Sequence, residues 1–102
     1  DNNVMSAFEG IVKVAQAAKM PVVAADTDAV KRGAVAALGL NYYDIGRQTG
    51  KVVVRILNGE APGAIPSQTS QSFELFVNPA AAQKQGVTLS DELVKSAKFV
   101  VR

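Results

Sequence analysis

Two short apolar runs lie between segments of helical periodicity, and their lack of polar alternation limits the folds that the chain can adopt. Residues 21–25 read Pro-Val-Val-Ala-Ala, and residues 34–40 form the second run. Strands without alternating polar residues are typical of a parallel sheet that helices cover on both faces. We therefore predict an α/β fold in three layers, with a mostly parallel sheet flanked by helices.

The remaining pattern supplies the other elements of such a fold. Helices are expected over residues 2–19, 29–32 and 42–57, strands over 67–77 and 99–101, and two further helices after Asn78 and Ser90. Asn2 or Asn3 can cap the first helix, and Thr27 or Asp28 the second, because short polar side chains accept from free helix N–H groups.

Composition excludes several classes of function. The 102 residues are 48% hydrophobic and 20% charged with a net charge of +2, so the chain can form a core and lacks the basic patch of a nucleic-acid-binding protein. Cysteine and histidine are absent, which removes thiolate nucleophiles, zinc-finger spacings and the usual general base at neutral pH. We expect no catalytic residue, metal or cofactor, and therefore no enzyme.

Three polar clusters stand where strands of the predicted sheet end. In an open α/β sheet, ligands bind at the carboxyl ends of the strands. A carboxylate or amide at this edge can hold a ligand ammonium group, and a tyrosine can stack on a ring. The candidate ligand-binding residues are Asp1, Asn2, Asp26, Thr27, Asp28, Asn41 and Tyr42.

Each cluster also has a purely structural interpretation. Asp26–Asp28 is compatible with a turn and a helix cap, Asp1 and Asn2 with an N-cap, and Tyr42 with packing at a helix start. Gly46 and Gly50 do not form a phosphate loop, because the following residues are out of register with that motif. We expect these glycines to allow close packing of helices.

Three longer motifs together resemble a known family. They are PVVAADTDAVKRGAVAALG, YYDIGRQTG and FELFVNPAAAQKQGVT. The chain is similar in these motifs to the C-terminal region of ABC-importer substrate-binding proteins of the tryptophan/tyrosine type. The similarity covers nearly the whole chain but a minor part of a full-length member, so a fragment is expected.

The resemblance implies two α/β lobes of the type I periplasmic binding protein fold, with ligand held in the cleft between them. Residues 1–40 and 74–102 would belong to the C-terminal lobe, and residues 41–73 would form a hinge crossing and an inter-lobe helix. The implied function is extracytoplasmic capture of a small amino-acid-like solute, with an aromatic amino acid as first choice. The implied partner is an ABC permease, and a lipid anchor on the full-length protein is one option.

Two alternatives remain at this stage. The chain could be a stand-alone α/β domain that oligomerises, or the ligand-sensing domain of a repressor, which shares the two-lobed fold. We also expect a homo-oligomer, most simply a two-fold dimer, because the helix over residues 43–57 has a broad apolar stripe. Leaving several hundred Å² of such surface in water costs several kcal/mol, at about 25 cal/mol per Å².

Overall fold

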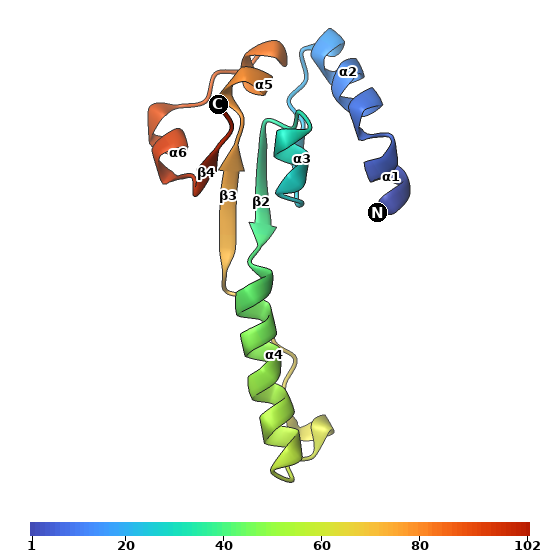
Figure 1. Cartoon of the computed structure of the whole chain (residues 1–102), viewed down its shortest axis with the longest axis vertical. Coiled ribbons are helices and arrows are strands. Elements are labelled where there is room, and N and C mark those ends of the chain that lie inside the picture. The colour runs from blue at the N-terminus through green and yellow to red at the C-terminus, as the bar shows by residue number, and fades with distance from the viewer. The chain divides into compact units, whose positions relative to one another are not determined.

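The computed structural model describes all 102 residues and groups them into two compact units. The first unit comprises residues 1–39 and 74–102, and the second comprises residues 40–73. Figure 1 labels the elements of both. None of the helices has both the length and the apolar character that are needed to cross a membrane.

A four-stranded sheet forms the centre of the first unit. Its strands are β1 (Val23–Ala24), β2 (Ala36–Leu40), β3 (Phe73–Val77) and β4 (Phe99–Val100), in the order β1-β2-β3-β4. β1 is parallel to β2 and β3 is parallel to β4, whereas the two middle strands run in opposite directions (Figure 1). The predicted α/β class with flanking helices is confirmed, and the sheet is mixed.

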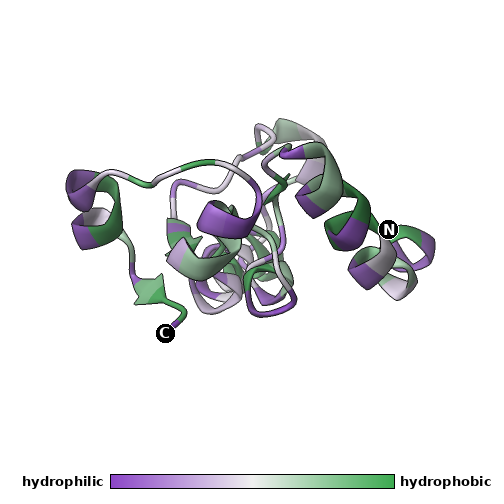
Figure 2. Cartoon of the chain, turned by 90° about the horizontal axis from the view of Figure 1, so that it is seen from above, coloured by the Kyte–Doolittle hydropathy of each residue, from purple (hydrophilic) through white to green (hydrophobic).

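Helices accompany both ends of this sheet. α1 (Asn2–Ser6), α2 (Phe8–Ala18) and α3 (Asp28–Lys31) lie on the side of β2 away from β3, α5 (Pro79–Lys84) lies beyond the end of β3, and α6 (Asp91–Ser96) lies beside β4 (Figure 1). Along the helices near the N-terminus, hydrophobic and hydrophilic residues alternate in bands (Figure 2). The hydrophobic bands supply part of the main core cluster, which contains Phe8, Val12, Ala29, Val30, Ala34 and Ala37.

The single helix predicted over residues 2–19 is wrong, because the backbone breaks at Ala7. Ala7 has φ −103° and ψ 13°, and it ends α1 and precedes α2. The Arg32 guanidinium donates to the Met5 carbonyl at 2.5 Å, which occupies an acceptor beside the break. The N-cap of α1 is Asp1 rather than Asn2 or Asn3, since the Asp1 carboxylate accepts from two backbone N–H groups.

The strand predicted over residues 21–25 is shorter and more exposed than expected. The Val22 carbonyl accepts from the Val35 N–H at 2.8 Å, and the strand itself comprises only Val23 and Ala24. Val23 itself is 70% exposed, because β1 is an edge strand and nothing in this chain covers its outer face. The expectation of a strand buried on both faces is therefore wrong for β1 in this chain.

Gln85 ties three elements of the first unit together. It follows α5 and is fully buried, with its side-chain oxygen 2.7 Å from the Val22 nitrogen and its side-chain nitrogen 2.7 Å from the Gly33 carbonyl oxygen. These bonds satisfy the backbone just before β1 and in the turn before β2. A buried amide with both ends paired fixes local geometry, because each unmade bond would leave a desolvated polar group.

The second unit consists of one long helix and a returning segment. α4 (Tyr42–Leu57) has the predicted bounds, with Asn41 as its N-cap and Gly59 in the left-handed region after its end. A short 3₁₀ helix, η1 (Pro62–Ala64), follows, and the chain then runs back along α4. Every residue from 40 to 73 stays at least partly exposed, so this unit has no core of its own.

Candidate functional site

The loop after β1 is held at the carboxyl end of the sheet by its own hydrogen bond. The Asp26 carboxylate accepts from the Asp28 backbone nitrogen at 3.0 Å, immediately before α3 begins. Thr27 occupies the N-cap position but makes no side-chain cap bond. Asp26 therefore provides the cap that the sequence analysis assigned to Thr27 or Asp28, and that assignment is corrected.

Gly39 lets this loop pack across the end of β2. A Cβ atom at Gly39 would lie 2.5 Å from the Thr27 methyl carbon and 3.4 Å from the Ala25 carbonyl oxygen. No side chain fits at that separation, so the close approach requires glycine. Gly39 was not among the predicted site residues. In the sequence, its role is indicated only by its position near the end of an apolar strand, where a glycine often marks a close approach of another backbone.

Asp1 and Asn2 lie at the start of α1, in the same unit as the Asp26 loop. The N-terminus and the carboxyl end of β2 lie toward the same, lower end of this unit in Figure 1. The Asp1 side-chain oxygen accepts from Asn3 at 2.8 Å and Val4 at 3.1 Å, so one of its oxygens is engaged in capping. Asn2 is exposed in the first turn of α1.

An ion pair between Arg32 and Glu9 connects α2 to the end of α3. Arg32, which follows α3, contacts both carboxylate oxygens of Glu9, with nitrogen–oxygen distances of 2.7 and 2.9 Å. This hydrogen bonding lowers the pKa of the Glu9 carboxyl to about 2 and raises the pKa of Arg32. The same guanidinium lies over the Phe8 ring, 5.4 Å from its centre. This Arg32–Glu9 pair fixes the α1–α2 break against α3, which is the helix that begins at the Asp26 loop.

Asn41 and Tyr42 belong to the second unit. The Asn41 side chain accepts from the Asp44 nitrogen at 3.1 Å, and its own backbone N–H donates to the Ser72 carbonyl at 3.4 Å. The Ser72 hydroxyl in turn donates to the Asp44 carboxylate at 2.8 Å. Tyr42 extends into solvent with 81% of its surface exposed, so it is available for a contact and does not pack as the alternative interpretation required.

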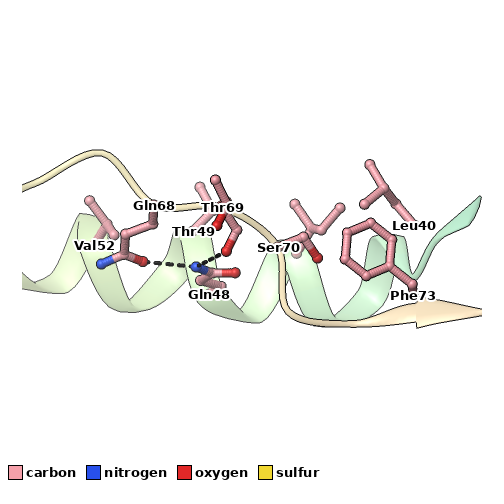
Figure 3. A pocket seen from close by; sticks show the side chains of 9 residues that line it. Leu40, Gln48, Thr49, Val52, Gln68, Thr69, Ser70 and Phe73 are labelled. Carbon is pink, nitrogen blue, oxygen red and sulfur yellow. Dashed lines mark hydrogen bonds between the residues drawn. The ribbon is translucent and has the colours of Figure 1, made fainter.

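An open groove runs between α4 and the returning segment (Figure 3). Leu40 and Phe73 lie at one end, and Val52 and Gln68 at the other. Gln48 bridges the two walls, since its side-chain nitrogen lies 2.9 Å from the Gln68 side-chain oxygen and 3.4 Å from the Thr69 carbonyl oxygen. The polar groups therefore bond to each other across a mainly apolar groove, which is better suited to covering by another apolar surface than to recognition of a polar ligand.

The sequence analysis missed this groove because its walls lie about twenty residues apart in the chain. Gln48 and Gln68 show no shared motif, and only the folding of residues 65–73 along α4 brings them together. A second apolar hollow lies in the first unit along α2, where Ile11, Val14 and Met20 are exposed. No group of three or more acidic, histidine or cysteine side chains is placed to hold a metal ion.

Comparison with known proteins identifies the class to which these features belong. Residues 1–101 match the family described as ABC transporter substrate binding protein, and the chain belongs to that family. It is 31% identical to a tyrosine-binding protein of Clostridioides difficile, over 96% of this chain and 31% of that protein. The predicted resemblance to ABC-importer substrate-binding proteins is thereby confirmed.

The chain is also similar to solved structures. A conserved domain protein of Vibrio cholerae is 40% identical with a TM-score of 0.77, covering 99% of this chain and 34% of its own. An ABC domain of Streptococcus pneumoniae in complex with L-Trp is 30% identical with a TM-score of 0.72, covering 99% and 35%. The chain thus spans about a third of the length of these relatives. Membership of a substrate-binding family supports the prediction that it is a ligand-binding chain and no enzyme.

Proposed function

We propose that this chain is the part of an extracytoplasmic solute-binding protein that helps to form the ligand cleft and the hinge of an ABC importer component. The observation that carries the proposal is the family match over residues 1–101. It favours this function over the alternative of a stand-alone oligomerisation domain or a repressor's sensing domain. A lipid anchor on the full-length protein and an ABC permease as partner belong to the same proposal.

The proposed domain division follows the family's two-lobed architecture. Residues 1–40 and 74–102 would belong to the C-terminal lobe, and residues 41–73 would provide a hinge crossing and the inter-lobe helix. The separation of the chain into units at residues 39/40 and 73/74 supports this division. So does the absence of a core within residues 40–73, because a helix with apolar surface and no core of its own needs cover from elsewhere. The groove beside Gln48 is the surface that we assign to the other lobe.

The proposed ligand is a small amino-acid-like solute, with aromatic amino acids tested first. Two relatives are described as tyrosine-binding and as complexed with L-Trp, which supports this choice. We assign ligand contact to Asp1, Asn2, Asp26, Thr27, Asp28, Asn41 and Tyr42 at the carboxyl edge of the sheet. A ligand that contacts both lobes in the closed form binds that form more tightly and therefore favours closure. The permease would then recognise the closed form.

Calorimetry on a full-length protein that carries this chain tests the proposal. Asp26→Ala should weaken binding of the preferred amino acid by about 1–3 kcal/mol, the range for removing a partner of a charged hydrogen bond. The matched control is Asp91→Ala, which removes an exposed acid from the first turn of α6. Unchanged affinity with a lower melting temperature would show that Asp26 acts only as a helix cap. If the unmodified protein bound no amino acid at all, that result would contradict the proposed function itself.

A further inference from the structure

The helix α1, which begins beside Asp1 and contains Asn2, has little packing of its own to fix its place. It is five residues long and buries none of them completely. Met5 is partly buried against the core cluster, and the break at Ala7 separates α1 from the longer α2. A helix of this length is unstable in isolation, because its few hydrogen bonds barely offset the cost of ordering the first turn. Contacts from other elements must therefore help to set its position.

Arg32, at the end of α3, supplies such a contact. Its Nη2 atom donates to the Met5 carbonyl oxygen at 2.5 Å and to a Glu9 carboxylate oxygen at 2.9 Å, and its Nε atom donates to the other Glu9 oxygen at 2.7 Å. Two-bond contacts between a guanidinium and a carboxylate are stronger and more directional than a single neutral bond. The guanidinium also lies over the buried Phe8 ring. One planar group thus holds the end of α1 and the first turn of α2 together.

The backbone of Arg32 is tied to the loop that contains Asp26. The Ala29 N–H donates to the Asp26 carbonyl at 3.2 Å, and the Arg32 N–H donates to the Ala29 carbonyl at 3.1 Å. Ala29 and Val30 are fully buried, so α3 is fixed to the core. The pKa of Arg32 is raised, chiefly by its hydrogen bonds with Glu9 and also by the negative charges of Glu9 and Asp26. Arg32 therefore links the Asp26 loop, through α3, to the end of α1.

We propose that Arg32 is a positioning residue that holds α1, and with it Asp1 and Asn2, in a fixed place beside the loop after β1. The inference rests on the proposed function, which assigns ligand contact to Asp1, Asn2 and the Asp26 loop. A binding edge built from two segments binds more tightly when both are held before the ligand arrives, because binding then does not have to order them. Releasing α1 should therefore weaken ligand binding and leave the sheet intact.

Hydrogen exchange on a full-length protein that carries this chain tests the hold on α1 without any ligand. The Met5 and Ala7 amides bond to carbonyls within the first turns of the chain, at 3.0 and 3.1 Å. Arg32→Ala should speed their exchange by about tenfold or more through local opening. The Asn78 and Val101 amides, which bond to other segments of the first unit, should keep their rates. Unchanged exchange in α1, or equal acceleration of all four amides, overturns the proposal.

Calorimetry of the same protein with L-tryptophan and L-tyrosine tests the consequence for binding. In Arg32→Ala, the Kd of the preferred amino acid should rise by about tenfold. Lys98→Ala is the matched control, because it removes the ion pair of Lys98 with Glu74, which lies in the same unit but joins β3 to the start of β4. The control should leave both the Kd and the exchange of α1 unchanged. An unchanged Kd for Arg32→Ala, or an equal rise for Lys98→Ala, overturns the proposal.

Arg32→Lys separates the geometry of the guanidinium from its charge. Lysine keeps a positive charge near Asp26 but replaces the planar fork that reaches both Glu9 and Met5 with a single ammonium group. This variant should therefore resemble Arg32→Ala in the exchange of α1 and in the Kd. Full recovery of both would show that charge alone suffices and would overturn the proposal. If the unmodified protein binds neither L-tryptophan nor L-tyrosine, the proposed ligand class fails, whereas the exchange rates still decide whether Arg32 holds α1.

Discussion

Replacing Gln85 by leucine should destabilise the first unit more than any change of similar volume on its surface. The substitution keeps much of the side-chain bulk but removes both hydrogen bonds, leaving the Val22 N–H and the Gly33 carbonyl without partners. An orphaned buried group costs about 1–3 kcal/mol, so two of them predict a loss of roughly 2–6 kcal/mol. That is a large part of the ~5–15 kcal/mol stability of a typical domain.

Urea unfolding followed by circular dichroism measures this loss. The control is Gln83→Leu, two residues earlier and exposed, which should stay within about 0.5 kcal/mol of the unmodified chain. At about 4–8 °C per kcal/mol for a domain of this size, the predicted loss also lowers the melting temperature by at least 8 °C. Equal midpoints for the Gln85→Leu and Gln83→Leu chains would refute the argument, because the two backbone groups would then have found other partners.

Gln85→Glu separates the hydrogen-bonding argument from simple packing. A carboxylate can still accept from Val22 but cannot donate to Gly33, whereas the protonated acid can do both. Burial raises the pKa of such a carboxyl in the folded state. Stability of this variant should therefore be greatest below the unfolded pKa of about 4.3 and should fall as the pH rises through the higher folded value. A pH-independent stability difference from the unmodified chain would argue against it.

Two further predictions concern glycines and acid stability. Gly39→Ala should lower the melting temperature, with a cost of about 1–3 kcal/mol for the clash with Thr27. Gly10→Ala, where nothing lies within 4 Å, should instead stabilise α2 by up to about 1 kcal/mol in calorimetric melts. Equal effects of the two substitutions would contradict the packing described. The Glu9 pKa of about 2 lies below its unfolded value of about 4.3, so this carboxylate contributes stability above that value that is lost as the pH falls toward 2. Acid titration of the urea midpoint should be shallower for Glu9→Gln than for the unmodified chain, and identical slopes would show that the Arg32 contact contributes nothing.

Local signals in the sequence predicted most of the elements. α4 was predicted from Tyr42 to Leu57 because its apolar spacing, its Asn41 cap and the Asn58-Gly59 stop all agree within one segment. Asn78 followed by Pro79, and Ser90 followed by two acids, likewise placed the starts of α5 and α6. These signals are readable because capping and periodicity depend on residues a few positions apart.

The sequence failed where a distant partner decides the local structure. The break at Ala7 lies beside the Arg32 contact with Met5, and the Val22 N–H just before β1 is bonded to the distant Gln85 side chain. Of the candidate site residues, the sequence placed Asp26, Thr27 and Asp28 at a strand end, but it could not show that Asp26 rather than Thr27 or Asp28 provides the cap.

By itself the sequence determined the α/β class, the caps of α4, α5 and α6, and the motifs that mark the substrate-binding family. The tertiary structure decided the mixed strand order, the closeness of Thr27 to Gly39, and the groove bridged by Gln48 and Gln68. The physical reason is range: hydrogen bonds and periodicity within one turn act between neighbours in sequence, whereas strand pairing and groove walls join residues that only folding brings into contact.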